Sequence, residues 1–440
     1  MSTAERAMSG LRIVAVAAGP GTAAGRAAAV HAFILLLITL FFLQDVVNLA
    51  AIHAGLQGLV PYVSGAKEAL IVAFLAFYLC ANAGRLAFDA RTVVIALLLA
   101  VFFAAYAAVG LTRYPAVGVL FELRTLAMPL ALVVVGWMYG DAVRGEPERA
   151  EALVRFYVAA CVLVAVSALF DYAYLSDEFW TTVNLGELER IKGYEVTSGA
   201  LPDNMYSFYF GRRAFGLAFN ALNLAYLVLP ALVIAWCRRR WLVFVLLAVA
   251  MLLTWSRQPI VAVAVVLAVS ALPPLAAVAA GFLAVPVIAW YLQAAYLELL
   301  NDPHALGHFT TVAIGLGGII ASPLGSGIGA AGIFASAYST LSTESALLNV
   351  ANQMGLPGLA LYAAAFVFFL RPHGPLDREI RLTGAAYAIT AVLSPHIFTI
   401  KSTFAFFLLL GVNLALAPRT APMRGQALVP RAATPGALSA

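Results

Sequence analysis

Charged side chains set in or beside long apolar stretches are the residues of this sequence best suited to do chemistry. A charge near the centre of a bilayer costs several kcal/mol unless it is paired or hydrated, so such residues often have a functional role. Guanidinium and ammonium groups bind phosphate oxygens through charge-assisted hydrogen bonds. The candidate side chains for binding an anion are Lys67, Arg124, Arg212, Arg213, Arg257 and Lys401.

These residues also have structural explanations. Arg124 stands inside an apolar stretch, from which it can reach the membrane surface or pair with a neighbouring helix. Arg257 lies between two apolar stretches and can anchor their ends at the membrane interface. Asn220 and Asn223, three residues apart on one predicted helix face, can join two helices by hydrogen bonds instead of binding a ligand.

The stretch TESALLNVANQMGLPGLALY (343–362) places a carboxylate and two asparagines before an apolar segment. Polar residues recur here at helical spacing, namely Ser342, Ser345, Asn349 and Asn352. They predict one polar stripe on a short helix that ends near Gln353, about 16 Å long and too short to cross a bilayer. Glu344 at its N-terminal end is either favoured by the helix dipole alone or serves as a general base or a sugar-hydroxyl contact.

A glycine-rich segment, PLGSGIGAAG (323–332), precedes that helix. Glycines suit tight turns and close approach of the backbone to a ligand, which makes Gly325, Gly327 and Gly329 candidate binding residues. The segment is not a P-loop, because no Gly-Lys-Ser/Thr follows.

Two histidines, His304 and His308, are spaced i, i+4 and share a face of a helix predicted from Asp302-Pro303 to about Ala321. HALGH lacks the glutamate of a zinc-protease motif, so we predict no metal and no other cofactor. His308 is a candidate catalytic or substrate-contacting residue.

The elements that must position these residues are transmembrane helices. Of the 440 residues, 63% are hydrophobic and 11% are charged, against about 25% charged in ordinary globular domains. The hydrophobic residues form blocks long enough for the ~20 residues that cross a bilayer. Three scattered cysteines make no disulfide framework, and arginine-rich loops account for the net charge of +5 without a nucleic-acid partner. We therefore predict an all-α polytopic membrane protein whose first span is retained.

We predict about 12 transmembrane helices, at residues 29–51, 66–83, 92–110, 116–140, 152–174, 215–237, 241–257, 258–274, 277–298, 357–371, 379–396 and 399–418. Arginine-rich loops place both termini in the cytoplasm, since cytoplasmic loops are enriched in Lys and Arg. A single transmembrane domain (29–418) then follows a cytoplasmic tail (1–28) and precedes a Pro/Ala/Arg-rich tail predicted to be disordered (419–440).

Two long segments, 175–213 and 299–356, fall on the outer side of this arrangement. The helix predicted within the second segment is interpreted as re-entrant or surface-lying. A thirteenth span there would move Arg371, Arg378 and Arg381 to the outer side, against the charge bias.

Several of these motifs stand in the order found in a known family. GHFTTVAIGLGGIIASPLGSGIGAAG, then a polar loop and TESALLNVANQMGLPGLALYAAAF, resemble the signature loop of the O-antigen ligase and polysaccharide polymerase superfamily. GRRAFGLAFNALN, LLTWSRQ and KEALIVAF are similar to further motifs of the family, so the resemblance extends from about Lys67 to Lys401.

The resemblance implies a GT-C-like glycosyltransferase of the bacterial inner membrane, with segments 175–213 and 299–356 in the periplasm. Its substrates would be an undecaprenyl-diphosphate-linked glycan donor and acceptor, in the synthesis of O-antigen, exopolysaccharide or another surface polysaccharide. Membrane lipids, a flippase and a chain-length regulator are the other implied partners. The cations would stabilise the diphosphate leaving group, and Glu344 or His308 would accept the proton of the acceptor hydroxyl.

Two alternatives to a polymerase remain open. One is a ligase that transfers the glycan to lipid A core or another acceptor, or a protein oligosaccharyltransferase. Ligases of the family commonly carry a histidine where Glu344 stands, and this departure favours polymerisation of repeat units over ligation to lipid A core. A secondary transporter also fits the span count, and GRLAFDAR (84–91) has a weak similarity to a transporter loop with its Gly-to-Asp spacing off by one. Transporters place ionisable groups near the bilayer midplane, whereas those of this sequence are predicted at the outer face.

Overall fold

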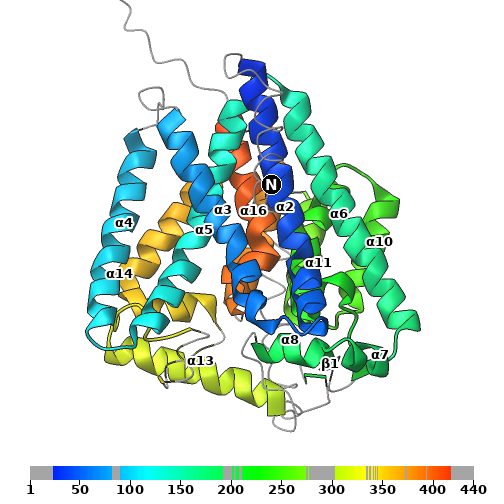
Figure 1. The fold of residues 1–440 in the computed structure, drawn as a ribbon. Coiled ribbons are helices and arrows are strands. Elements are labelled where there is room, and N and C mark those ends of the chain that lie inside the picture. Colours follow the sequence, from blue (N-terminus) through cyan, green and yellow to red (C-terminus); the bar gives the residue numbers. More distant parts are fainter. Residues whose placement is uncertain are drawn as a thin grey trace, which may run out of the picture.

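The protein is a helical bundle whose long helices run side by side, with short elements gathered at one end (Figure 1). The computed structural model describes residues 23–81, 90–191, 201–202, 205–207, 211–273, 276, 303–332, 335, 338–339, 341, 343, 345–371, 374–392 and 394–417. Its elements are α2 (Ala23–His53), η1 (Gln57–Leu59), α3 (Val60–Ala81), α4 (Ala90–Leu111), α5 (Ala116–Ala142), α6 (Pro147–Tyr174), α7 (Asp177–Thr182), α8 (Leu185–Ile191), β1 (Tyr206–Ser207), β2 (Gly211–Arg212), η3 (Gly216–Ala218), α9 (Ala221–Cys237), α10 (Trp241–Leu252), α11 (Arg257–Ala271), α13 (Pro303–Ala321), α14 (Ala346–Phe369), α15 (Asp377–Ala391), η5 (Pro395–Phe398) and α16 (Ile400–Leu416).

Six of the described helices are long and apolar enough to cross a bilayer: α2, α3, α4, α5, α6 and α14. Their outer surfaces carry large apolar side chains, and Val72, Phe77, Val101 and Leu163 are each between 62% and 68% exposed. An apolar surface of this extent is stable only against lipid or another apolar partner. The prediction of an all-α polytopic membrane protein is confirmed, apart from the two-residue strands β1 and β2, which pair antiparallel.

Other apolar helices are shorter than a full span. Helix α10 has 12 residues, which is about 18 Å of the ~30 Å hydrocarbon core. Helices α11 and α16 have 15 and 17 residues. The predicted span at 277–298 and most of both tails lie outside the described residues.

The helix predicted from residue 215 begins at Ala221, and the difference has a local cause. Phe219 has a left-handed backbone with φ of 56° and ends the turn η3. Asn220 is extended, and its side-chain oxygen accepts hydrogen bonds from the backbone N–H groups of Leu222 and Asn223 at 2.9 and 3.3 Å. Asn220 is therefore the N-cap of α9, and its predicted place on a helix face with Asn223 is wrong.

Helices α5 and α16 form the most extensive helix pair of the described chain. They run parallel, because Gly136 meets Leu408 and Gly140 meets Val412. A Cβ on Gly136 would overlap the carbonyl oxygen of Leu408, and one on Gly411 would overlap α5 in return. Small residues let two membrane helices approach this closely. The pairing fixes the first turns of α5 and α16 at the same end of the bundle.

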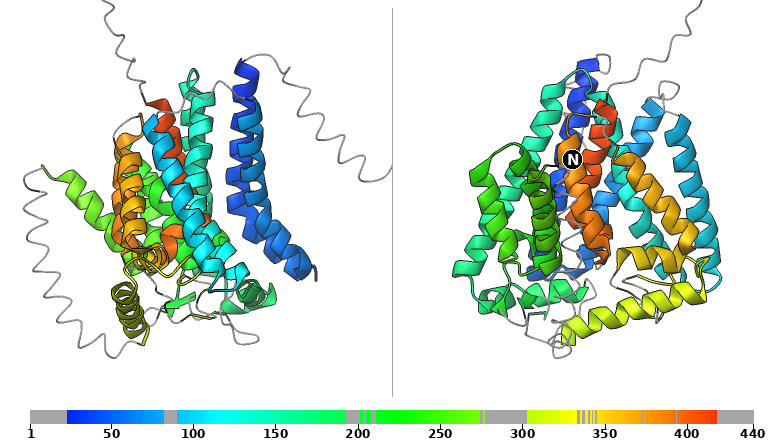
Figure 2. Two further views of the ribbon diagram at one scale, coloured as in Figure 1. Left: turned by 90° about the vertical axis from the view of Figure 1, so that its left-hand side faces the viewer. Right: turned by 180° about the vertical axis from the view of Figure 1, so that it is seen from behind.

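Helix α13 lies across that end of the bundle instead of running along it (Figures 1 and 2). It begins at Pro303 and ends at Ala321, as predicted. The side-chain amide of Asn352 on α14 donates to the carbonyl of Gly315 at 3.0 Å, and Gly318 leaves room for the same side chain. The transverse placement is the one expected of a helix that lies on the membrane surface or re-enters it.

Helix α14 is interrupted at Gly355, whose φ of 70° and ψ of 179° are not helical. The sequence predicts that the short polar helix ends near Gln353, and the break lies two residues beyond that point. The glycine-rich loop 323–332 packs against it, and the N–H of Gly327 donates to the carbonyl of Gln353 at 3.0 Å. A Cβ on Gly325 would overlap the backbone nitrogen of Gly355, so this glycine is required by backbone packing.

Gly327→Ala is expected to lower the free energy of unfolding by about 2 kcal/mol, because a side chain at positive φ is strained. The φ of Gly327 is 102°, and a Cβ there would lie 2.7 Å from the backbone nitrogen of Gly110. Thermal unfolding of the purified protein in detergent measures the effect. Gly317→Ala on α13 is the matched control, since nothing lies within 4 Å of its Cβ position. Equal melting temperatures for the two variants would contradict the packing role.

Candidate functional site

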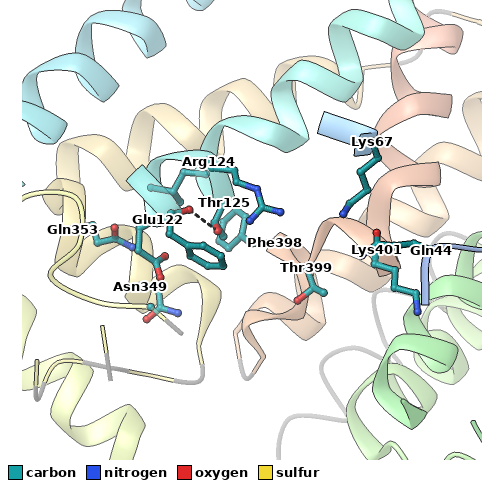
Figure 3. A pocket seen from close by; sticks show the side chains of 13 residues that line it. Gln44, Lys67, Glu122, Arg124, Thr125, Asn349, Gln353, Phe398, Thr399 and Lys401 are labelled. Carbon is teal, nitrogen blue, oxygen red and sulfur yellow. Dashed lines mark hydrogen bonds between the residues drawn. The ribbon is translucent and has the colours of Figure 1, made fainter. Parts of the chain in front are cut away.

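A cavity of about 190 Å³ opens among the early turns of α3, α5, α14 and α16 (Figure 3). It brings together three of the predicted cations, Lys67, Arg124 and Lys401, which come from three different helices. The described residues that line it are Gln44, Lys67, Phe121, Glu122, Arg124, Thr125, Leu126, Gly332, Asn349, Gln353, Phe398, Thr399 and Lys401.

Arg124 and Lys67 share one carboxylate. The Arg124 guanidinium forms an ion pair with Glu68 Oε1, and Lys67 Nζ lies 3.4 Å from the same oxygen. Lys67 Nζ also donates to the carbonyl of Ser64 at 2.6 Å. The Lys67 side chain is 7% exposed and that of Arg124 is 38% exposed, so Arg124 is the more available of the two to a ligand.

Lys401 closes the cavity from α16. Its ammonium forms an ion pair with the buried carboxylate of Asp45 on α2 and donates to the carbonyl of Ala218 at 3.0 Å. It also lies 6.0 Å from the centre of the Phe219 ring. Lys401 thereby joins α16 to α2 and to η3.

Glu122 brings a second carboxylate to the cavity, two residues before Arg124 in the sequence. The residue is 3% exposed, and a Cβ on Gly332 would overlap its carboxylate group. Gly332 has a φ of 121°, which also favours glycine at this position. Sequence reasoning missed Glu122 and Glu68, although the high cost of charges within apolar stretches applies to carboxylates as much as to arginines.

The cavity also has amide side chains, one helical turn apart on α14. Gln353 Oε1 accepts a hydrogen bond from the N–H of Gly329 at 3.0 Å. Asn349 is 5% exposed, and its Oδ1 is buried and accepts no hydrogen bond from the described residues. Buried polar atoms are rarely left unpaired, so Asn349 is well placed to bond a ligand hydroxyl. Asn352, also on the predicted stripe, faces α13 instead.

Figure 3 shows how these groups are distributed. Glu122, Asn349 and Gln353 lie on one side, Lys67 and Lys401 lie on the other, and Arg124 extends between them. Such a site can hold an anion against the cations and hydrogen-bond neutral hydroxyl groups on the amide side.

Arg212 lies outside the cavity lining and has a structural role. Its guanidinium forms an ion pair with the buried carboxylate of Asp171 and donates to the carbonyl of Leu175. The same carboxylate accepts hydrogen bonds from Trp180 Nε1 at 2.6 Å and from the N–H of Gly216 at 3.0 Å. This network ties the end of α6 to α7 and to η3.

Arg212→Gln is expected to destabilise the protein by about 3 kcal/mol or more, because it leaves the buried Asp171 without its cation. Thermal unfolding measures this loss. Arg190→Gln is the control, since the Arg190 side chain is 63% exposed and pairs with Glu187 on the same short helix. An Arg212→Gln protein as stable as the control would contradict the structural role and restore Arg212 as a ligand-binding candidate.

Arg213 and Arg257 form a separate pair of cations. Partial burial, and then the charge of Arg257, lower the pKa of Arg213 from its usual range. Arg257 is exposed at the first residue of α11. Neither residue is among those that line the cavity. The structure therefore divides the six predicted cations into three groups: the three of the cavity, Arg212 on Asp171, and this pair.

The predicted glycines are divided in the same way. Gly325 and Gly327 pack on other backbone segments, while the N–H of Gly329 orients Gln353 at the cavity edge. Gly332, which was not predicted, is the one glycine among the described lining residues.

The two predicted catalytic residues remain predictions. Glu344 lies outside the described residues, between Thr343 and Ser345, both of which are buried. Ser345 is the N-cap of α14, with its hydroxyl accepting from the N–H of Leu348 at 3.3 Å. His308 belongs to α13, and its side chain is outside the described part of the structure.

Comparison with known proteins gives no relative: no protein-family model, no curated protein and no solved structure matches this chain.

Proposed function

We propose that this protein is a lipid-carrier-dependent glycosyltransferase that polymerises undecaprenyl-diphosphate-linked repeat units at the periplasmic face of the bacterial inner membrane. The proposal includes about twelve spans, a GT-C-like arrangement and cytoplasmic termini. The observation that carries it is the cavity, in which Lys67, Arg124 and Lys401 meet beside the Asn349 amide, whose oxygen accepts no hydrogen bond from the described residues, inside a membrane-embedded bundle. A glycan on a lipid diphosphate has the matching features: an anionic group, neutral hydroxyls and an apolar tail.

The position of the cavity is consistent with a periplasmic site. Helix α2 begins and α16 ends at the end of the bundle opposite to α13 (Figure 2). The cavity lies among the early turns of α5 and α16, which is the α13 end. If arginine-rich loops hold the termini in the cytoplasm, the cavity faces the periplasm.

The chemical step needs a leaving group and a proton acceptor. The acceptor hydroxyl oxygen forms a bond to the anomeric carbon of the donor, the bond from that carbon to the diphosphate oxygen breaks, and the diphosphate leaves with the electron pair. Arg124 and the two lysines stabilise the negative charge that develops there. The hydroxyl proton passes to a carboxylate, for which Glu122 in the cavity joins Glu344 as a candidate.

Asn349 is the described side chain best suited to contact the sugar. A neutral amide both donates and accepts, as a sugar hydroxyl does, whereas a phosphate only accepts. Asn349 lies on the amide side of the cavity, away from Lys67 and Lys401 (Figure 3). We assign it to positioning a saccharide hydroxyl next to the diphosphate.

Gel analysis of surface polysaccharide from a deletion strain tests the proposed function. A single repeat unit on the anchor is the expected product, because loss of a polymerase stops extension after the first unit. Carrier-linked polymer with none on the anchor would assign the protein as a ligase instead. An unchanged polysaccharide would reject both activities.

A further inference from the structure

The cations of the cavity are paired with carboxylates of the protein itself. Glu68 pairs with both Arg124 and Lys67, and Asp45 pairs with Lys401. A bound diphosphate therefore cannot simply add to free positive charges. It must compete with a carboxylate that the protein itself supplies.

The exchange is easiest at Arg124. The side chain of Lys67 is 7% exposed and remains bonded to Ser64, and Lys401 is held by the buried Asp45 and by Ala218. Arg124 is 38% exposed, and its Nε makes no hydrogen bond with the described residues. Glu68 and Arg124 also stand on different helices, α3 and α5, so their contact can open without unwinding either helix.

We propose that Glu68 occupies the place of the ligand's anion on Arg124 and releases this arginine only to a ligand with more than one negative charge. This inference rests on the proposed function, because it concerns the same anion site. Glu68 is tethered beside Arg124, so its effective concentration is high and a singly charged group competes poorly with it. A diphosphate brings several oxygens and can engage the forked guanidinium in two places while facing both lysines. Glu68 thereby favours diphosphate-linked over monophosphate-linked carriers.

Binding of inorganic pyrophosphate and of dimethyl phosphate, a singly charged phosphodiester, to the full-length protein in detergent, followed by calorimetry, tests this role. Glu68→Gln is expected to tighten pyrophosphate binding by roughly fivefold, the scale of one lost partly exposed ion pair. Binding of dimethyl phosphate should tighten at least as much, so that the preference for pyrophosphate falls. Glu151→Gln is the matched control, because it removes a carboxylate paired with Arg238 at the other end of the bundle and should leave both affinities unchanged.

A second variant separates competition at Arg124 from a general gain of positive charge. In an Arg124→Gln background, Glu68→Gln should give no further tightening, since the arginine on which the carboxylate competes is gone. The same gain in both backgrounds, or no gain with Arg124 intact, would overturn the inference while leaving the anion site in place. If neither the wild type nor any variant bound pyrophosphate, the anion site would lose its support, and the proposed function with it.

Glu68→Asp is a second test that can be used if the Glu68→Gln protein misfolds. It keeps a counter-charge for Lys67 but is one methylene shorter, so it is expected to lose its contact with Arg124. It should therefore tighten pyrophosphate binding in the same direction as Glu68→Gln. Weaker binding by a folded Glu68→Asp protein would contradict the competition between Glu68 and the ligand.

Discussion

Arg124→Gln is expected to lower the rate of chain extension by about a hundredfold or more, with the protein still inserted and folded. Arg124 is the most exposed of the three cavity cations and extends between the amide side and the lysine side (Figure 3). Its charge is the one best placed to stabilise the departing diphosphate. Glutamine keeps much of the side chain's length but removes the charge and the forked pair of donors. The assay is the polymer length and rate of the variant reconstituted in vesicles with a carrier-linked repeat unit.

Arg113→Gln is the control for that experiment. Arg113 is an exposed arginine in the loop just before α5, and it donates to the carbonyl of Ser326 at 3.3 Å outside the cavity lining. Its loss should change the rate little. The rate of chain extension of Arg124→Lys should lie between those of Arg124→Gln and Arg113→Gln, because lysine keeps the charge but cannot donate from two points as a guanidinium does. Normal polymer from Arg124→Gln would mean that the arginine has only its pairing role with Glu68.

The fold class and the three cations that line the cavity could be predicted from the sequence. Both predictions depend on the free-energy cost of placing polar or charged groups in lipid. Long apolar blocks predict spanning helices, and a charge within a block predicts either a partner or a function. Arg124 was predicted in this way, whereas Lys67 and Lys401 were predicted as cations at the outer ends of spans. The same rule, applied to carboxylates, would also have found Glu68 and Glu122.

What could not be predicted depends on contacts between distant parts of the chain. Arg212 and Arg213 are adjacent and look alike in the sequence, yet Arg212 is held by Asp171, 41 residues earlier. The use of Gly325 for packing depends on Gly355, which lies 30 residues later at the break of α14. The predicted start of α9 was wrong for a local reason. The apolar composition continues through Phe219, but the left-handed backbone of Phe219 and the Asn220 cap place the first residue of α9 at Ala221.

The placement of α13 was predicted from charges outside the helix. Helix α13 is apolar over Thr310–Ala321, which is shorter than the six helices able to cross a bilayer. The sequence alone leaves a thirteenth span open. The arginines near the end of α14 argued against one, because a further crossing would reverse their side. The observed helix lies across the bundle end (Figure 1), and its glycines contact the first half of α14. This contact holds the half-helix that carries Asn349 and Gln353.

Glu122→Gln is expected to lower the rate of chain extension by about 10²-fold to 10⁴-fold, the usual contribution of a general base. Glu122 is enclosed in the cavity between Arg124 and the loop at Gly332, where an acceptor hydroxyl beside the diphosphate would come within its reach. The measurement is single-turnover transfer from one carrier-linked unit to another, with thermal unfolding to verify that the variant is folded. Glu178→Gln on α7 is the control, because Glu178 is an exposed carboxylate on a short helix gathered at the α13 end.

Single-turnover transfer by Glu344→Gln, compared with that by Glu122→Gln, decides which carboxylate accepts the proton. If Glu344 is the base, as its place before the polar half-helix predicts, Glu344→Gln should abolish extension, while Glu122→Gln should only reduce it. The pH dependence separates these roles: removal of the base abolishes the rise in rate that follows its deprotonation, whereas a positioning change lowers the rate at every pH and keeps that rise. Full-length polymer from both variants would exclude carboxylate base catalysis by either residue, and a site made of cations and amides would then have to act by orientation and charge stabilisation alone.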